Sequence, residues 1–448
     1  MPPSQKDAMV GTMNSADGIS YLYDVFVSTA VEKAQASAES DRTRILSMVE
    51  SDVGFQSFNY QVNELLRNWV KNSAIEFVNA MIENSEDSGN DENISGLCNQ
   101  VGYALNVNGE YDEALIMLDN SLQIARNIYG DDHINCSVVC NNIGQVYMNK
   151  GEYENALGYL RKALDLQQRY EEPDQSAMAK TVMSIGAASF HMDKYKDALE
   201  CYQWALNINL SLDGNDDEVA SNYDNLGSVH KILGNTDEAN ACYLKAISIR
   251  EEKFGDMHPD TNLSYNNYAS MLSDIGQQDK ALEYFEKVLH VETKILGKNH
   301  YNTAITIHNM GLAYFRDNRY DQALEFYRRS LEVKLLTIGA NHASTSTSYL
   351  GIGGVYAALG KFPESVDNYE KALAIHRNTV NEENSSAAYI YNNLGISLVG
   401  MESYESGLEY LTKAKQIWEK DLGQEHERTI ALKEDIAGIH KLMNEKDK

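Results

Sequence analysis

The chain has 448 residues, of which 43% are hydrophobic and only five are proline, so it can form a continuous core. Its 38 basic and 66 acidic residues give a net charge of −28, which repels phosphate backbones and anionic lipids. We therefore expect the chain to bind neither nucleic acid nor a membrane. No segment approaches the roughly 18 consecutive apolar residues of a membrane span, and the N-terminus lacks the basic and apolar parts of a signal peptide. A soluble, cytoplasmic protein is expected.

Three stretches precede the regular part of the chain. Residues 1–15 are polar and are predicted to be disordered. Residues 16–82 carry apolar side chains at helical spacing, from Ile19 to Ile82, and are predicted to form helices. They have three interpretations: a cap for the helices that follow, a homodimerisation element, or a regulatory segment that folds over a binding surface. Residues 83–93 are acidic, lack a continuous apolar pattern and are predicted to be a linker.

From residue 94 to residue 428, one pattern recurs eight times. In the copy Tyr223–Pro259, a glycine (Gly227) is followed by an alanine twelve residues later and by a tyrosine sixteen residues later. Such a fixed period of helical pattern predicts an all-α solenoid of helical hairpins, with residues 429–448 as a C-terminal capping helix. The equivalent small residues recur every 41 or 42 positions: Gly102, Gly144, Gly186, Gly227, Ala269, Gly311, Gly353 and Gly395.

Within each repeat, the small residues are expected to let the two helices of a hairpin approach closely. An aromatic residue nine positions after the glycine, such as Tyr111 or Tyr153, is expected to begin the second helix. A Gly-x-x-His loop ends several repeats, as at Gly255, and its glycine is predicted to cap the second helix. The histidines recur once per repeat, too far apart to share a metal ion.

Catalysis and cofactor binding are not expected. The sequence lacks a phosphate-binding P-loop, a nucleophile elbow and a zinc-protease motif. Cys136 and Cys140 are one helical turn apart, but no CxxC pair or matching histidine pair accompanies them, so we expect no metal. The other cysteines, with Cys140, are expected at core positions of the repeats: Cys98, Cys140, Cys201 and Cys242. No repeat carries an unexplained polar residue at a core position, which an active site would require.

The glycine, the alanine twelve residues later, the aromatic residue at sixteen and the alanine at nineteen resemble the tetratricopeptide repeat. The 42-residue period and the loop Gly255–Pro259 resemble more closely the repeats of kinesin-light-chain-like proteins. This resemblance implies a right-handed superhelix whose concave groove, lined by the first helix of each repeat, binds an extended peptide. The N-terminal region lacks the long heptad coiled coil of a light chain, so the chain is not expected to be a kinesin light chain proper.

The resemblance also implies the residues of the groove. An amide two positions before the glycine would pair with a peptide backbone, since it both donates and accepts hydrogen bonds; a local structural role is the alternative. Lys180 is the one basic residue at the position a turn earlier, and His308 and Arg316 are further positive points. The candidate amides are Asn142, Asn225, Asn267, Asn309 and Asn393.

Because the groove has few cations and the chain is acidic, the expected partner is a neutral to basic peptide or protein. The leading hypothesis is a non-catalytic scaffold or adaptor. Two alternatives remain open: an autoinhibited regulatory protein whose N-terminal helices occupy the groove, and a motor cargo adaptor.

Overall fold

The computed structural model of the protein describes residues 71–72, 75–76, 78–80, 82, 91–379 and 385–446. The predicted disorder of residues 1–15, most of the helical region 16–82 and most of the linker 83–93 lie outside these residues. The described chain is α-helical, with no strand, so the all-α prediction is confirmed. It divides into two compact units at Glu218 and Val219, which are described separately below.

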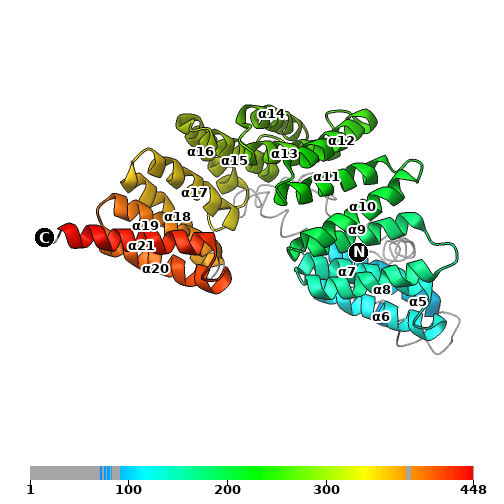
Figure 1. The fold of residues 1–448 in the computed structure, drawn as a ribbon. Helices are drawn as coiled ribbons and strands as arrows, with labels where there is room; N and C mark the ends of the chain where they lie inside the picture. Colours follow the sequence, from blue (N-terminus) through cyan, green and yellow to red (C-terminus); the bar gives the residue numbers. More distant parts are fainter. Residues whose placement is uncertain are drawn as a thin grey trace, which may run out of the picture. The chain divides into compact units, whose positions relative to one another are not determined.

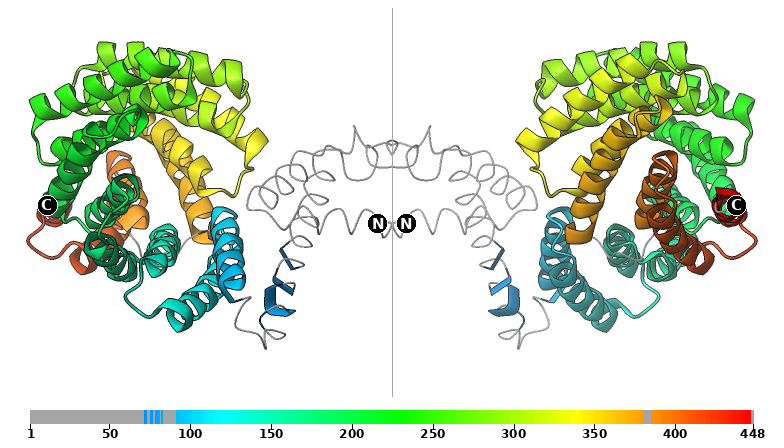
Figure 2. Two further views of the ribbon diagram at one scale, coloured as in Figure 1. Left: turned by 90° about the vertical axis from the view of Figure 1, so that its right-hand side faces the viewer. Right: turned by 90° about the vertical axis from the view of Figure 1, so that its left-hand side faces the viewer.

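Within each unit the helices follow one another as hairpins, and the second helix of a hairpin packs against the first helix of the next one. Figure 1 shows this order, and Figure 2 shows the helices from two further sides. In the first unit the helices are α5 (Asp91–Val107), α6 (Tyr111–Tyr129), α7 (Ile134–Lys150), α8 (Tyr153–Arg169), α9 (Gln175–His191) and α10 (Tyr195–Leu210).

The second unit takes in most of α11 and all the helices after it, and it has the same pairing. Each second helix from α6 to α10, and from α16 to α20, begins at the aromatic residue nine positions after the small residue, as predicted. The helices are α11 (Asp216–Ile232), α12 (Thr236–Phe254), α13 (Pro259–Asp274), α14 (Gln278–Ile295), α15 (Tyr301–Arg316), α16 (Tyr320–Thr337), α17 (Ala343–Ala358), α18 (Phe362–Thr379), α19 (Ser385–Gly400), α20 (Tyr404–Asp421) and α21 (Glu427–Lys446).

The recurring glycine lets the two helices of a hairpin touch. A Cβ atom added at Gly102 would lie 2.6 Å from Cγ of Leu118, and one added at Gly311 would lie 2.9 Å from the ring of Tyr327. Both contacts are with the residue sixteen positions later, so the first helix packs its backbone directly on that side chain. The alanine at twelve, such as Ala323, is fully buried. The predicted close approach is confirmed.

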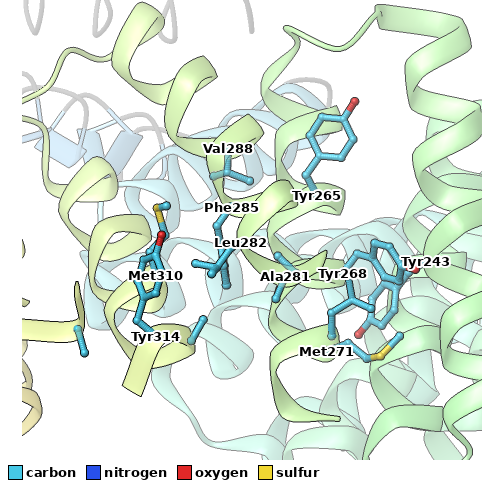
Figure 3. Close-up of a cluster of buried hydrophobic side chains, with 14 of the residues drawn as sticks. Tyr243, Tyr265, Tyr268, Met271, Ala281, Leu282, Phe285, Val288, Met310 and Tyr314 are labelled. Atoms are coloured by element: carbon cyan, nitrogen blue, oxygen red, sulfur yellow. The ribbon is translucent and has the colours of Figure 1, made fainter. Parts of the chain in front are cut away.

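The hairpins are held together by residues that contact the next repeat. In the second unit, Leu282 and Phe285 of α14 lie between Tyr268 of α13 and Tyr314 of α15, as Figure 3 shows. Phe285 is 1% exposed. Burying an aromatic side chain of this size stabilises the fold by roughly 1.5–3 kcal/mol, and much of that burial depends on the neighbouring repeat. A single hairpin therefore cannot bury its own apolar face.

The ends of the repeat array are covered by further side chains. Val78, in the predicted N-terminal region, is fully buried and belongs to the same core cluster as Ile94 and Cys98. At the other end, Leu432 and Ile439 of α21 join the cluster that contains Leu411 of α20. We propose that residues around Val78 and helix α21 cap the two ends of the solenoid.

The Gly-x-x-His loops join one hairpin to the next. Gly255 has a φ of +83°, which a residue with a side chain rarely adopts, and it follows the end of α12. His258 is the N-cap of α13, and its Nδ1 atom accepts a hydrogen bond of 3.2 Å from the backbone N–H of Asp260. The predicted role of the loop glycine as a helix C-cap is confirmed, and the loop histidines serve as N-caps of the following helices.

The cysteines are free thiols. Cys98 and Cys140 are fully buried, as expected, and Cys136 is fully buried as well. Cys201 and Cys242 are only half-buried. Burial raises the pKa of Cys98 and of Cys140 to about 11, so both thiols stay protonated and unreactive at neutral pH.

Candidate functional site

Each first helix has a partly exposed face made of equivalent positions, which we call the first-helix face. It contains the positions six and two residues before the recurring small residue and one and five residues after it, since these spacings follow the helical period. On α13 these positions are Leu263, Asn267, Ser270 and Asp274. Leu263 is 53% exposed. The face is therefore open to solvent and partly apolar.

Three successive first helices of the second unit carry an amide at the same position on this face. Asn225 of α11, Asn267 of α13 and Asn309 of α15 are half-buried, and we call them the amide row. None of the three forms a hydrogen bond through its side chain to any other described residue, and none is among the buried polar atoms without a partner. Their amides are thus accessible to solvent and available to a ligand.

An ion chain aligns these three helices. Asp274 at the end of α13 accepts from Nζ of Lys231 on α11 at 3.0 Å and from Nη1 of Arg316 on α15 at 2.7 Å. Burial alone would raise the pKa of Asp274, but the hydrogen bonds and charges of the two cations lower it below the usual value. The ion chain lies about two helical turns beyond the amide row, so it fixes the relative register of the helices that present the amides.

The other predicted amides have partners within the protein. In the first unit, Nδ2 of Asn142 donates to Oδ1 of Asn99 on the neighbouring first helix, α5, at 2.8 Å. In the second unit, Oδ1 of Asn393 accepts from Nδ2 of Asn392 at a long 3.5 Å. Asn142 therefore has the structural role that was the alternative for these residues, while the amide row does not.

The predicted cations are placed differently. Lys180 on α9 has a side chain that is 61% exposed, with a carboxylate oxygen of Glu218 at 3.8 Å, so it remains accessible. Arg316 is engaged in the ion chain.

His308 does not supply the positive charge that was expected of it. Burial, and then the charge of Lys334, lowers the pKa of His308 to about 3. Its ring is neutral at physiological pH and packs against the ring of Tyr327 with centroids 5.0 Å apart. This correction leaves fewer cations on the face than the sequence indicated.

A second correction concerns polar residues in the core. The position 23 residues after the small residue faces the next repeat, and it is polar in most repeats. Arg250 of α12 is 3% exposed, and Lys334 of α16 is 1% exposed. The expectation that no repeat carries an unexplained polar residue at a core position is therefore wrong. The polar residues at this position are Gln167, Asn209, Arg250, Glu292, Lys334 and His376.

Several polar side chains at this position have hydrogen-bond partners on neighbouring helices. Nη1 of Arg250 donates to Oδ2 of Asp224 and to Oγ of Ser264, each at 2.6 Å. Oε2 of Glu292 accepts from the hydroxyl of Thr306 at 2.7 Å. Ser264 and Thr306 occupy the same position on successive first helices, so these contacts link one repeat to the next.

The described residues offer no metal site and no membrane span. No group of three His, Cys, Asp or Glu side chains among them is arranged to hold a metal ion. No helix in the described part of the chain is both long and apolar enough to cross a bilayer.

Comparison with protein-family models identifies the repeat. The tetratricopeptide repeat model matches the overlapping ranges 95–169, 137–211, 177–252, 218–291 and 260–335. A second tetratricopeptide repeat model matches residues 345–385 and 387–428. Together these ranges cover well over half of the chain. No curated protein sequence matches it.

Solved structures with similar folds include the apo form of RapI, with 16% identity and a TM-score of 0.51, covering 63% of this chain and 97% of that one. BtubC (BKLC) from P. vanneervenii has 19% identity and a TM-score of 0.45, covering 51% and 93%. A putative kinesin light chain with nearly identical TPR-like repeats from Podosopora anserina has 21% identity and a TM-score of 0.40, covering 46% and 97%. At these identities the likeness concerns the fold alone.

Proposed function

The chain belongs to the tetratricopeptide repeat family, and on that premise we propose that it is a non-catalytic scaffold that binds an extended peptide on its first-helix face. Proteins of this family bind protein partners. The observation that carries the proposal is the amide row: three equivalent asparagines on adjacent repeats whose side chains form no hydrogen bond with any other residue that the structure describes. An extended backbone presents N–H and C=O groups at regular intervals, which a row of amides can pair with.

The charge distribution supports a largely neutral partner. The first helices α17 and α19 contain no Asp, Glu, Lys or Arg, although 23% of the whole chain is charged. Apolar side chains on the same face are exposed, among them Leu263 and Ile396. A largely neutral peptide with apolar side chains fits this surface, because it would place few buried charges against uncharged helices.

The free cysteines support a cytoplasmic location. All five are free, which suits a reducing environment such as the cytoplasm.

The role of the N-terminal region distinguishes the simple scaffold hypothesis from the autoinhibited alternative. Val78 is buried in the first core cluster, which favours the cap interpretation for the residues around it. Deleting residues 1–70 keeps this contact. The deletion leaves peptide affinity unchanged for a simple scaffold and raises it if the deleted segment competes for the face.

The proposal is tested by comparing the proteins captured from a cell lysate by two variants. In the first variant, Asn225, Asn267 and Asn309 are all replaced by alanine. In the matched control, the same change is made at three asparagines of second helices, of which two are exposed and the last is half-buried: Asn155, Asn207 and Asn368. The proposal expects a partner that the wild type and the control capture and the amide-row variant loses. Identical partners for all three proteins would refute it, provided that thermal unfolding shows the fold intact.

A further inference from the structure

The buried cations of two repeats differ in their counter-ions. Arg250 and Lys334 occupy the same position two repeats apart. Arg250 forms an ion pair of 2.6 Å with Asp224 on its own first helix. The residue equivalent to Asp224 in the repeat of Lys334 is His308, which is neutral. Lys334 has no Asp or Glu within ion-pair distance among the described residues. It is therefore a buried ammonium whose negative partner is missing.

The hydrogen bonds of Lys334 point to the first-helix face. Its Nζ atom donates to the backbone oxygen of Ser344 at 2.9 Å, to Oγ1 of Thr347 at 3.2 Å and to Oγ of Ser348 at 3.1 Å. Ser348 is buried, but Thr347 is exposed. Thr347 is also the residue of α17 at the position six before the small residue, where the face carries few cations. A positive charge therefore lies directly beneath an exposed hydroxyl.

The surroundings of Lys334 do not neutralise this charge. Helix α17, which receives all three hydrogen bonds, contains no charged residue. His308 keeps its Nδ1 atom buried without a hydrogen-bond partner. Burial lowers the pKa of Lys334 to about 8, so the side chain still carries its proton at neutral pH. A nearby anion would recover part of the cost of burying this charge.

We propose that one carboxylate of the partner peptide binds at Thr347, above the ammonium of Lys334, and takes the place that Asp224 has beside Arg250. This rests on the proposed function and adds to it the acceptance of one acidic residue at a defined position in an otherwise neutral peptide. The Thr347 hydroxyl now donates to the backbone oxygen of Ser344 at 2.8 Å. On binding it turns to donate to the carboxylate, while its oxygen still accepts from Lys334.

The experiment follows the lysine side chains of the full-length protein by NMR after labelling at Cε. The Lys334→Gln variant identifies the signal. The pKa of Lys334 is measured in sodium chloride and in sodium acetate at the same ionic strength. Lys371 is the matched control, because it is an exposed lysine on α18 that is paired with Asp367 at 2.7 Å. We expect the pKa of Lys334 to rise in acetate by about half a unit or more, a roughly threefold change in proton affinity, and that of Lys371 to stay constant.

Two results would overturn the proposal. Equal responses of Lys334 and Lys371 to acetate mean that no carboxylate site exists. A Lys334 pKa in chloride that is already at the ordinary value of lysine means that an acidic residue of this chain occupies the site. Neither result depends on the amide row, so the anion site can fail while peptide binding stands. Once a peptide is mapped, replacing its acidic residue by the amide should weaken binding about tenfold to the wild type and have no effect on Lys334→Gln.

Discussion

Buried Lys334 makes the free energy of unfolding rise with pH, whereas a lysine in a surface ion pair makes it fall. The pKa of Lys334 falls from 10.5 to about 8 on folding because of burial. Below pH 8 the Lys334 side chain is charged in both the folded and the unfolded protein, and the folded protein carries the full cost of burying that charge. Between pH 8 and 10.5 the unfolded chain binds more protons than the folded chain, so this group makes stability rise with pH.

The size of the effect follows from the two pKa values. The folded and unfolded pKa values of Lys334 differ by about 2.5, which raises the free energy of unfolding by about 3 kcal/mol once the lysine is neutral in both states. By pH 9.5 the free energy of unfolding has risen by about 2 kcal/mol of this amount. Lys334 is 1% exposed, so solvent screens little of it. The buried tyrosines, whose pKa values are raised on folding, act in the opposite direction above pH 10. Comparison with a variant removes their contribution.

The assay is urea unfolding of the wild type and of Lys334→Met at pH 7.0, 8.5 and 9.5. Methionine has a similar length and no charge, so the difference in the free energy of unfolding between the two proteins isolates the ammonium. We expect the wild type to gain about 2 kcal/mol relative to the variant from pH 7.0 to 9.5. If the difference in the free energy of unfolding between the two proteins stays constant from pH 7.0 to 9.5, the lysine is not buried as described.

Three further predictions concern the framework of the repeats. Gly311→Ala should lower the free energy of unfolding by about 1–3 kcal/mol, because the new Cβ atom would lie 2.9 Å from the ring of Tyr327. In Gly158→Ala nothing lies within 4 Å of the added Cβ atom, so the change should be neutral or stabilise the protein by up to about 1 kcal/mol. Both variants are compared with the wild type by thermal unfolding, and equal effects of the two changes would refute the close approach of the helices. His342→Ala should cost about 0.5–2 kcal/mol through loss of the cap bond to the N–H of Ser344, whereas exposed His290→Ala should cost little. Asp224→Asn removes the carboxylate charge 2.6 Å from Nη1 of buried Arg250 and should cost about 3–5 kcal/mol in chemical unfolding, against less than about 1 kcal/mol for Asp367→Asn in its exposed pair. A small effect of Asp224→Asn would contradict the buried ion pair.

The repeat architecture was predictable because its causes recur in every copy. The small residue at Gly311, the large residue at Tyr327 and the aromatic at Tyr320 all lie at fixed spacings, so each copy confirms the others. The start of the second helix at Tyr320 and the close contact between helices follow from these positions. The histidine caps were within reach of the same reasoning, since each histidine stands immediately before a helix.

The electrostatics of the site were not predictable from the pattern. The position of Lys334 holds a different polar residue in each of several repeats, so comparing copies gives no single type to recognise. Its burial depends on how α16 packs against α17, which is a tertiary contact. The neutral state of His308 has the same origin, because burial against Tyr327 decides it. The hydrogen bond from Asn142 to Asn99 likewise joins two repeats, and it separates Asn142 from the otherwise equivalent amide row.

The most direct test of the proposed function measures one peptide against the amide row. A peptide mapped from a captured partner is titrated by fluorescence anisotropy into the wild type, the amide-row variant and the control variant with alanine at Asn155, Asn207 and Asn368. Each lost hydrogen bond is worth about 1 kcal/mol, so three should weaken binding on the order of 100-fold. We expect that loss in the amide-row variant and none in the control. Equal affinity for all three proteins would show that the first-helix face of α11, α13 and α15 does not bind the peptide.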